Sequence, residues 1–193
     1  MKEAWRIFKL VVVLVIMLGL AYPLLMVAVG KLYGNKAEGD LVSVAGRAVG
    51  ARNIGQAFSS AMFFHGRPSA AGDGYDAMKS GASNLGPSNP ELGKLARERI
   101  VVLLRENPGL KKADIPVELI TGSASGLDPE ISPESASLQV PRVSKATGIS
   151  IDKLKALVEK HTAGRTLAIF GEPRVNVLEL NIDVLAASGG ASK

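Results

Sequence analysis

The sequence contains no cysteine, only two histidines and few aromatic side chains. A lack of cysteine fits an oxidising or a reducing compartment equally well, so it does not locate the protein. His65 and His161 have no second histidine or cysteine near them in the sequence, which argues against a zinc site. Aromatic residues make up 5% of the chain and no block of like charges accompanies the net charge of +5, so a nucleic-acid partner is not expected.

Charged residues are missing altogether from one stretch, Leu10 to Gly30. As a helix, these twenty-one residues span about 30 Å, the thickness of the hydrocarbon core of a bilayer. Pro23 does not exclude a membrane helix, because such helices tolerate proline where neighbours satisfy the freed carbonyl. A cleaved signal peptide is the alternative, but its apolar region usually has only about 7–15 residues. We therefore expect a retained membrane helix at 10–30.

The basic residues on either side of this stretch predict its orientation. Residues 1–9 contain three Lys or Arg side chains and residues 31–40 contain two. The side richer in Lys and Arg remains in the cytoplasm, which places the N-terminus inside the cell. The predicted division is a cytoplasmic tail (1–9), a single-pass membrane helix (10–30), a linker (31–40), one extracytoplasmic soluble domain (41–186) and a flexible tail (187–193).

Cap residues and stop signals predict three helices in the soluble domain. Asn89 and Ser132 each precede a proline and then a glutamate, the pattern of a helix start, and Ser150 is a third cap residue. Glycine or an Asn-Pro-Gly run marks each end. The predicted helices run from Asn89 to Asn107, from Ser132 to Gly148 with a break or kink at Pro141, and from Ser150 to Gly164.

Other segments have the pattern of strands, so the fold class expected after the membrane helix is α+β. Residues 41–44 alternate, and short strands and turns follow up to Phe58. Residues 115–120 and 166–170 are short apolar runs, and residues 178–184 alternate strictly between apolar and polar side chains.

A long surface loop, residues 65–90, interrupts this pattern. It is rich in Gly, Ser, Asn and Pro and has few large apolar residues. Loops of this length in compact domains are usually functional or disordered. Asn and Ser side chains can order a loop by bonding to local backbone, so we expect an ordered loop that meets a partner, with a mobile insertion as the alternative.

Motifs for catalysis and for phosphate binding are not found. Gly34 to Gly39 is followed by Asp40 rather than Lys, so it is not a Walker motif. Gly122 to Gly126 has Ala124 at its centre, so it is not a nucleophile elbow. No nucleophile stands with a base in the sequence, which predicts no catalytic residue, no metal and no firmly bound cofactor. A membrane-anchored extracytoplasmic hydrolase using Ser69 and His65 remains an alternative.

Six segments together resemble one family, the C subunits of the bacterial Kdp potassium-transporting ATPase. They occur in order, at sensible spacing, through nearly all of the chain. The matching segments are VGARNIGQAF (49–58), FHGRPSA (64–70), SGASNLGPSNP (80–90), SGLDPEISP (125–133), QVPRV (139–143) and EPRVNVLEL (172–180).

The resemblance implies a non-hydrolysing accessory subunit of an ATP-driven, high-affinity potassium uptake complex in the bacterial inner membrane. Its implied partners are a channel-like potassium-binding subunit, a P-type ATPase subunit, a small single-helix subunit and membrane lipid. The implied role is to stabilise the assembly. Candidate partner contacts within the matching segments and beside them are His65, Arg67, Ser83, Asn84, Asn89, Arg142 and Asn176.

The resemblance also implies a second role, that of a catalytic chaperone that raises the ATP affinity of the ATPase subunit. Gln139 is the position that would contact the nucleotide, with ATP held through the ATPase subunit. An extracytoplasmic domain does not reach cytoplasmic ATP, and the chain lacks a phosphate cradle. Both the assembly role and the nucleotide role therefore remain open at this point.

Overall fold

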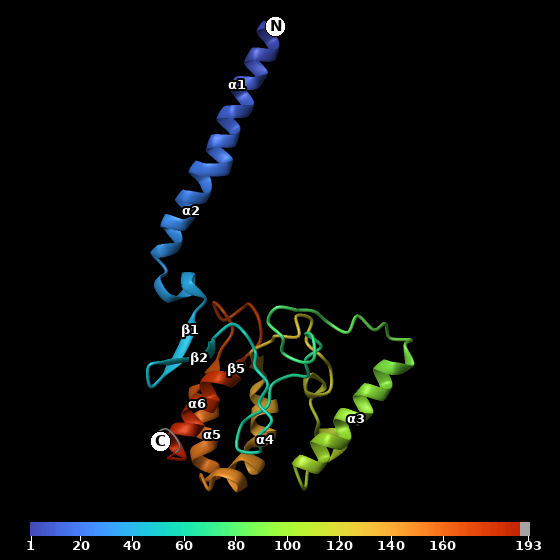
Figure 1. The fold of residues 1–193 in the computed structure, drawn as a ribbon. Helices are drawn as coiled ribbons and strands as arrows, with labels where there is room; N and C mark the ends of the chain where they lie inside the picture. Colours follow the sequence, from blue (N-terminus) through green and yellow to red (C-terminus); the bar gives the residue numbers. More distant parts are fainter. Residues whose placement is uncertain (190–193) are drawn as a thin grey trace. The chain divides into compact units, whose positions relative to one another are not determined.

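The computed structural model describes residues 1–189, and its chain divides into two compact units. The first unit comprises Met1–Leu41 and the second begins at Val42. Together they form an α+β fold with one N-terminal apolar helix followed by a domain of mixed helices and strands (Figure 1). The fold class predicted from the sequence is therefore confirmed. Of the predicted flexible tail at 187–193, residues 190–193 lie outside the described residues.

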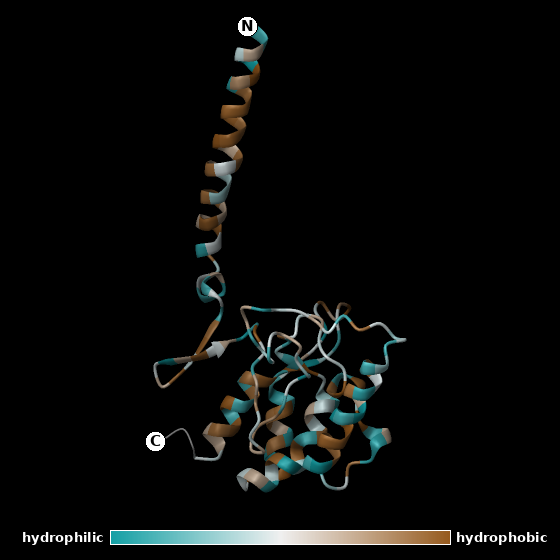
Figure 2. Cartoon of the chain, turned by 45° about the vertical axis from the view of Figure 1, so that its right-hand side comes forward, coloured by the Kyte–Doolittle hydropathy of each residue, from teal (hydrophilic) through white to brown (hydrophobic). Residues whose placement is uncertain are grey.

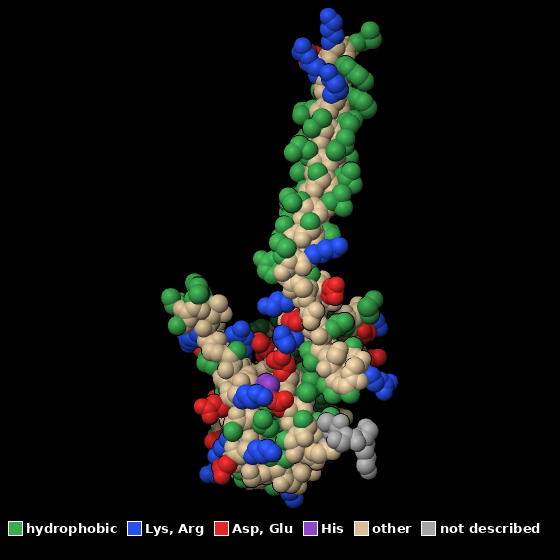
Figure 3. Space-filling model, turned by 90° about the vertical axis from the view of Figure 1, so that its left-hand side faces the viewer, with side chains coloured by type: hydrophobic (Ala, Val, Ile, Leu, Met, Phe, Trp, Pro, Cys, Tyr) green, Lys and Arg blue, Asp and Glu red, His purple; other side chains and the backbone are tan. Residues whose placement is uncertain are grey.

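The first unit is one continuous helical rod. It consists of α1 (Lys2–Ile16), a π-helical segment (Met17–Ala21) and α2 (Tyr22–Lys31), followed by a 3-10 helix (Gly34–Glu38) in the predicted linker. Among the described residues, Lys2–Lys31 is the one helix long and apolar enough to cross a membrane. Hydrophobic residues predominate along its length (Figure 2), and Lys and Arg side chains gather at its N-terminal end (Figure 3).

The π-helical segment accounts for Pro23 within this rod. Proline cannot donate a backbone hydrogen bond, and its ring clashes with the carbonyl four residues earlier. The amide of Tyr22 bonds instead to the carbonyl of Met17, one residue further back than in an α-helix. A wider turn therefore stands directly before the proline, so the rod continues without a break.

The described part of the second unit contains four α-helices. They are α3 (Pro90–Glu106), α4 (Pro133–Thr147), α5 (Ile151–Lys160) and α6 (Val177–Ala187). The predicted caps Asn89, Ser132 and Ser150 each accept a hydrogen bond from a backbone N–H in the first turn. The predicted starts of α3, α4 and α5 are therefore confirmed.

Two details of these helices differ from the sequence prediction. Pro141 does not break α4, which runs on to a left-handed Gly148. Pro141 is solvent-exposed while Val140 and Val143 beside it are buried, so core packing holds the helix on both sides of the proline. Helix α5 ends at Lys160 rather than at Gly164, because Thr162–Ala163 joins a sheet as β4.

The strand predicted at residues 178–184 is wrong, since these residues belong to α6. Val177, Leu178, Leu180, Asn181 and Val184 are its buried residues, which is the spacing of a helix face rather than that of a strand. The alternation of apolar and polar residues predicted a strand wrongly, because the polar Asn181 lies inside the protein whereas the apolar Ile182 is only half-buried.

The strands predicted at residues 115–120 and 166–170 are also wrong. The first region forms 3-10 helices at Lys112–Asp114 and Val117–Leu119, although Leu119 is buried as expected. The second is a turn in which Thr166 and Phe170 pair with each other. Leu167 and Ala168 have positive φ angles there and reverse the chain.

Within the described residues, the strands form two small sheets. β1 (Leu41–Val44), a predicted strand, pairs with β2 (Arg47–Ala51). β5 (Arg174–Asn176) lies between β3 (Glu130–Ile131) and β4, and both pairings are antiparallel. In register, Glu130 faces Asn176 and Thr162 faces Val175. The larger sheet thus joins the start of α4 to the start of α6.

The hydrophobic core lies between α4, α5, α6 and this larger sheet. The connections 66–89, 121–129 and 164–173 gather at one end of the second unit, where α3, α4 and α6 begin, and α5 begins at the other end (Figure 1). Helix α3 stands apart, and none of its residues, all of which the structure describes, is fully buried. The core side chains are Phe64, Ile131, Ala136, Val140, Val143, Ile149, Leu154, Val158, Val175, Val177, Leu180 and Val184.

Candidate functional site

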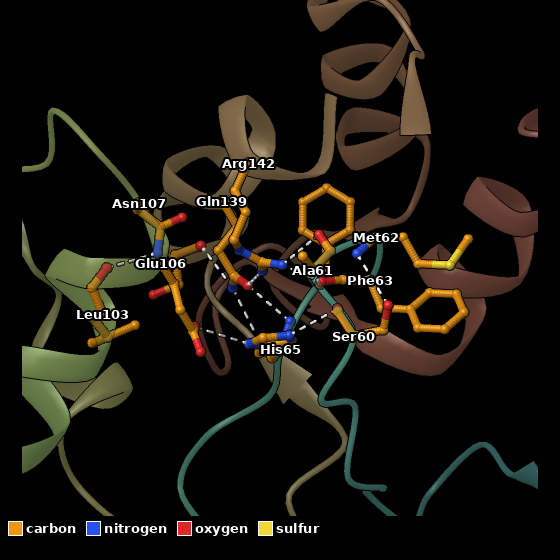
Figure 4. Close-up of polar contacts among 12 residues, drawn as sticks. Ser60, Ala61, Met62, Phe63, His65, Leu103, Glu106, Asn107, Gln139 and Arg142 are labelled. Carbon is orange, nitrogen blue, oxygen red and sulfur yellow. Dashed lines mark hydrogen bonds and ion pairs between the residues drawn. The ribbon is translucent and has the colours of Figure 1, made fainter. Parts of the chain in front are cut away.

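Gln139 on α4 holds the backbone of His65 at both of its polar groups. The Gln139 Oε1 atom accepts from the His65 amide at 2.8 Å, and Nε2 donates to the His65 carbonyl at 3.0 Å (Figure 4). Nε2 also donates to the carbonyl of Ser135 at 3.2 Å. The side chain is 2% exposed. A neighbouring strand would offer the same donor and acceptor, so this carboxamide takes the place of a strand partner.

Asn181 on α6 bonds to both backbone polar groups of Phe64, the residue before His65. Its Oδ1 atom accepts from the amide of Phe64 at 2.7 Å, and its Nδ2 atom donates to the carbonyl of Phe64 at 2.9 Å. The Phe64 ring is fully buried in the core. The two carboxamides, together called the carboxamide clamp, thus satisfy the backbone of Phe64 and His65 where no strand lies beside them.

Arg142, one turn after Gln139 on α4, bonds to the residues that precede Phe64 and His65. Its Nη1 atom donates to the carbonyls of Ala61 at 2.7 Å and Phe63 at 3.0 Å, and Nη2 donates to Gln139 Oε1 at 2.7 Å (Figure 4). Burial lowers the pKa of Arg142, while the nearby Glu106 raises it. Arg142 therefore fixes both the segment 61–63 and the orientation of the Gln139 amide.

His65 connects this segment to α3. Its Nδ1 atom lies 3.5 Å from Glu106 Oε2, and its Nε2 atom lies 3.1 Å from the carbonyl oxygen of Ser60. Burial, and then the positive charge of Arg142, lower the pKa of His65 below its ordinary value of 6.5. A carbonyl oxygen can only accept, so Nε2 is the donor in the contact with Ser60.

The first half of the surface loop is packed on residues 122–128. Arg67 pairs with Asp128 at 3.0 Å, and the Tyr75 hydroxyl donates to the carbonyl of Arg67. The hydroxyl of Ser69 donates to the carbonyl of Gly126 and accepts from the amide of Tyr75 at 2.7 Å. Burial, and then the charge of Asp128, raise the pKa of Tyr75 to about 12. This half of the loop is thus ordered by specific contacts, in agreement with the prediction of an ordered loop.

Gly126 is a point of close approach between these two segments. Its φ is +68°, and a Cβ atom there would lie 2.6 Å from the carbonyl oxygen of Gly81 and 2.7 Å from the amide of Ala71. The amide of Gly81 also donates to the carbonyl of Ser125 at 2.8 Å. A residue with a side chain at position 126 would therefore push the surface loop away.

The predicted partner contacts fall into three groups. His65, Arg67 and Arg142 belong to the network around the surface loop, and Gln139 belongs with them. Asn89 and Asn176 are the N-caps of α3 and α6. Ser83 and Asn84 are exposed to solvent, in the second half of the surface loop. The structure thus brings His65, Arg67 and Arg142 together with Gln139 and leaves Ser83 and Asn84 facing outward.

Sequence reasoning missed Asn181, although it is half of the clamp. A signal for it exists: Asn176 followed three residues later by Glu179 is a helix start, and the Asn176 side chain accepts from the Glu179 amide at 3.1 Å. In that helix frame, Asn181 becomes a lone polar residue on the apolar face. Such a residue indicates a buried hydrogen bond.

Glu106 lines two open cavities. One of about 810 Å³ separates the end of α3 from α4 and is lined by Arg105, Arg142 and Lys145, among others. The other, of about 370 Å³, includes Tyr75 and Arg99 in its lining. Among the described residues, no three His, Cys, Asp or Glu side chains gather in a way that could hold a metal ion.

Comparisons with known proteins agree with this architecture. A family model described as "K+-transporting ATPase, c chain" matches residues 4–186. A potassium-transporting ATPase KdpC subunit of Koribacter versatilis is 48% identical over 174 residues, covering 90% of this chain and 89% of the relative.

Two further relatives carry the same name. The protein of Caldanaerobacter subterraneus is 44% identical over 185 residues, covering 95% of each chain. That of Mycobacterium tuberculosis (strain H37Ra) is 45% identical over 174 residues, covering 90% of this chain and 92% of the relative. The family predicted from six short segments is therefore confirmed, and the chain belongs to the KdpC family, the c chains of K+-transporting ATPases.

Proposed function

We propose that this chain is an accessory subunit, without ATP hydrolysis of its own, of an ATP-driven potassium uptake complex. Its role is to stabilise the assembly of the channel-like and P-type ATPase subunits, with a small single-helix subunit beside them. The observation that carries this proposal is the family match across residues 4–186. In this proposal the N-terminus is cytoplasmic and the domain extracytoplasmic, as the excess of basic residues before the helix favours.

Two parts of the molecule support an assembly role. The first is the helix Lys2–Lys31, whose apolar side chains are exposed along its whole length and offer a surface to lipid or to other helices. The second is the surface loop, whose first half is fixed on residues 122–128 while Ser83 and Asn84 face solvent. A loop that is ordered at its base and exposed beyond it can present side chains in a fixed position, which limits the entropy lost on binding.

The nucleotide role of Gln139 receives less support. Its carboxamide already makes four hydrogen bonds, to His65, Ser135 and Arg142. The side chain is almost completely buried. A nucleotide would have to replace these bonds and leave the His65 backbone unpaired, which costs free energy. We therefore assign Gln139 to holding the segment that leads into the surface loop.

The hydrolase alternative also conflicts with the geometry. The Ser69 hydroxyl donates its hydrogen to the carbonyl of Gly126, and it accepts from the amides of Ala71 and Tyr75. The His65 ring faces Ser60 and Glu106 instead. A serine nucleophile needs its hydroxyl hydrogen directed at a base, so this pair is not arranged for catalysis.

The assembly role is tested by adding a large charged side chain where contact is proposed. In the variant Ser83→Arg with Asn84→Arg, two arginines stand on the exposed half of the surface loop. We expect the other subunits to be lost on affinity purification of this chain, together with potassium uptake at low external potassium. The two arginine side chains would hold the loop and the partner subunit apart, so a contact through residues 83 and 84 would be lost.

The matched control places the same side chain on an exposed helix face, at Lys155→Arg with Ala156→Arg on α5. We expect this variant to purify with its partners and to support uptake. Full co-purification of the loop variant would show that residues 83–84 are not a contact. If Gln139→Met lowered ATP affinity without affecting folding or assembly, the nucleotide role would replace the one proposed.

A further inference from the structure

The turn between β4 and β5 exposes large apolar side chains that nothing in the described part of the second unit covers. Leu167, Ile169 and Phe170 are 80%, 69% and 63% exposed. They follow one another within five residues, Thr166 to Phe170, that contain no charge. We call these five residues the apolar turn. Exposed apolar clusters of this kind mark interaction sites rather than ordinary surface.

Four of the five backbone amides of the apolar turn donate to carbonyls of the turn or of Arg165. The amide of Thr166 donates to the carbonyl of Phe170 at 2.8 Å, and the amide of Phe170 donates back to Thr166 at 2.9 Å. The amides of Ala168 and Ile169 bond to Arg165 and Thr166. Hydrocarbon offers no hydrogen-bond partners, so these bonds lower the free-energy cost of bringing the turn to the surface of a bilayer.

The conformation that presents these side chains is unfavourable in isolation. Leu167 and Ala168 have φ angles of 53° and 60°, in the left-handed region where side chains are disfavoured. Strained backbone of this kind concentrates at functional sites. The Leu167 side chain is exposed rather than packed in the core, so an external apolar environment would stabilise it.

Two charged side chains, Arg165 and Glu172, flank the apolar turn and would limit how deeply it can enter a lipid bilayer. The Arg165 guanidinium donates to both Glu172 carboxylate oxygens, at 2.6 and 2.8 Å. This pair stands on either side of the apolar turn and carries no net charge. Its place is the polar headgroup region, with the apolar side chains beyond it.

The chain's own membrane helix keeps this turn within reach of a bilayer. Only the ten residues from Leu32 to Leu41 separate α2 from the second unit, and they span at most about 35 Å when fully extended. Within the second unit, the β1 residues from Val42 on and the connection that holds the apolar turn lie at the same end (Figure 1). The tether therefore enters the unit at the end that carries the turn.

We propose that the apolar turn is a second membrane anchor, which inserts Leu167, Ile169 and Phe170 into the surface of the bilayer that the N-terminal helix crosses. The occupant is lipid acyl chain just below the headgroups. One short turn binds lipid weakly by itself, but the tether supplies a high local concentration of membrane, so a weak contact is sufficient. Two points of attachment would restrain the orientation of the domain relative to the membrane.

The test places the only tryptophan of the full chain in the turn. Trp5→Phe removes the native tryptophan, Phe170→Trp adds the probe, and the protein is reconstituted into lipid nanodiscs with or without bromine on the acyl chains. We expect bromolipid to quench most of the fluorescence of the introduced tryptophan, and its emission to lie at shorter wavelength than that of a water-exposed tryptophan. An aqueous quencher such as iodide should have little effect.

The matched control is Ile151→Trp in the same Trp5→Phe background. Ile151 is also exposed and begins α5, at the opposite end of the unit from the apolar turn (Figure 1). We expect its tryptophan to be quenched by iodide and not by bromolipid. Circular dichroism of both variants verifies that each is folded.

Two outcomes would overturn the proposal. A tryptophan at position 170 that responds to iodide and not to bromolipid would show that the turn stays in water. A tryptophan there that is unaffected by bromolipid, and protected from iodide only after assembly with the other subunits, would assign the turn to a protein interface instead. Because neither readout depends on potassium uptake, failure here leaves the assembly role proposed above untouched.

Discussion

Gln139 and Asn181 lie on different helices, yet they hold adjacent residues of one extended segment. Gln139 on α4 bonds both backbone groups of His65, and Asn181 on α6 bonds both backbone groups of Phe64. Successive residues of extended chain present their polar groups to opposite sides, so two helices can each satisfy one residue. The segment that leads into the surface loop is thereby tied to the hydrophobic core.

Replacing Gln139 with methionine should destabilise the domain. Methionine keeps a similar volume but leaves the buried backbone groups of His65 without partners, which costs about 1–3 kcal/mol for each unsatisfied group. We expect a lower free energy of unfolding in urea, measured by circular dichroism on the full chain in detergent. The exposed Ser83→Ala is the control and should be close to neutral. An unchanged urea midpoint for Gln139→Met would show that the clamp contributes nothing to stability.

Gly126→Ala should release the first half of the surface loop. The methyl group would clash with the backbone of Gly81 and Ala71, and a positive φ alone costs alanine about 1 kcal/mol. We expect faster amide hydrogen exchange and faster proteolysis in residues 66–81. Gly86→Ala serves as the control, because a Cβ there meets nothing within 4 Å. Equal exchange rates in both variants would contradict the role assigned to Gly126.

The stability of the domain should fall as the pH drops below about 6.5, the ordinary pKa of histidine. The pKa of His65 is lowered in the folded protein, first by burial and then by Arg142. The unfolded chain therefore binds the proton more readily, and the stabilising effect of neutral His65 is fully present above pH 6.5 and is lost as the pH falls through the folded pKa.

The measurement for His65 is urea unfolding between pH 7.5 and pH 5, and the comparison is His65→Gln, which retains a donor for Ser60 but does not titrate. We expect the wild type to lose more stability over this range than the variant does. Glu106 partly opposes the shift, so removing its charge in Glu106→Gln should steepen the decline. Parallel pH profiles for the wild type and His65→Gln would exclude His65 as the titrating group.

Asn176 makes two hydrogen bonds, one that caps α6 and one to the backbone of Arg52, and substitutions can distinguish their contributions to stability. Its Oδ1 atom caps α6 by accepting from Glu179, and its Nδ2 atom donates to the carbonyl of Arg52 at 2.8 Å. Asn176→Asp keeps the cap and loses the donor, while Asn176→Ala loses both. The alanine variant should therefore be less stable than the aspartate variant by about 1 kcal/mol, the usual value of an N-cap. Thermal unfolding of both variants checks this order, and equal midpoints would contradict it.

Local signals in the sequence determined the apolar N-terminal helix, the caps Asn89, Ser132 and Ser150, the strand at 41–44 and the long loop. Each depends on neighbours in the chain: an uncharged run long enough for a bilayer, or a side chain that bonds to the backbone two or three residues on. Six short segments were also sufficient to identify the family.

Only the tertiary structure decided which residues of 178–184 lie inside and how the surface loop is held. Alternation of apolar and polar residues fits a strand, but Asn181 is buried because a backbone 117 residues away in sequence needs its carboxamide. The same holds for Gln139, whose partner His65 is 74 residues away. Hydrogen bonds between distant segments leave no periodicity in the sequence. The sequence therefore could not identify the backbone partners of Gln139 and Asn181.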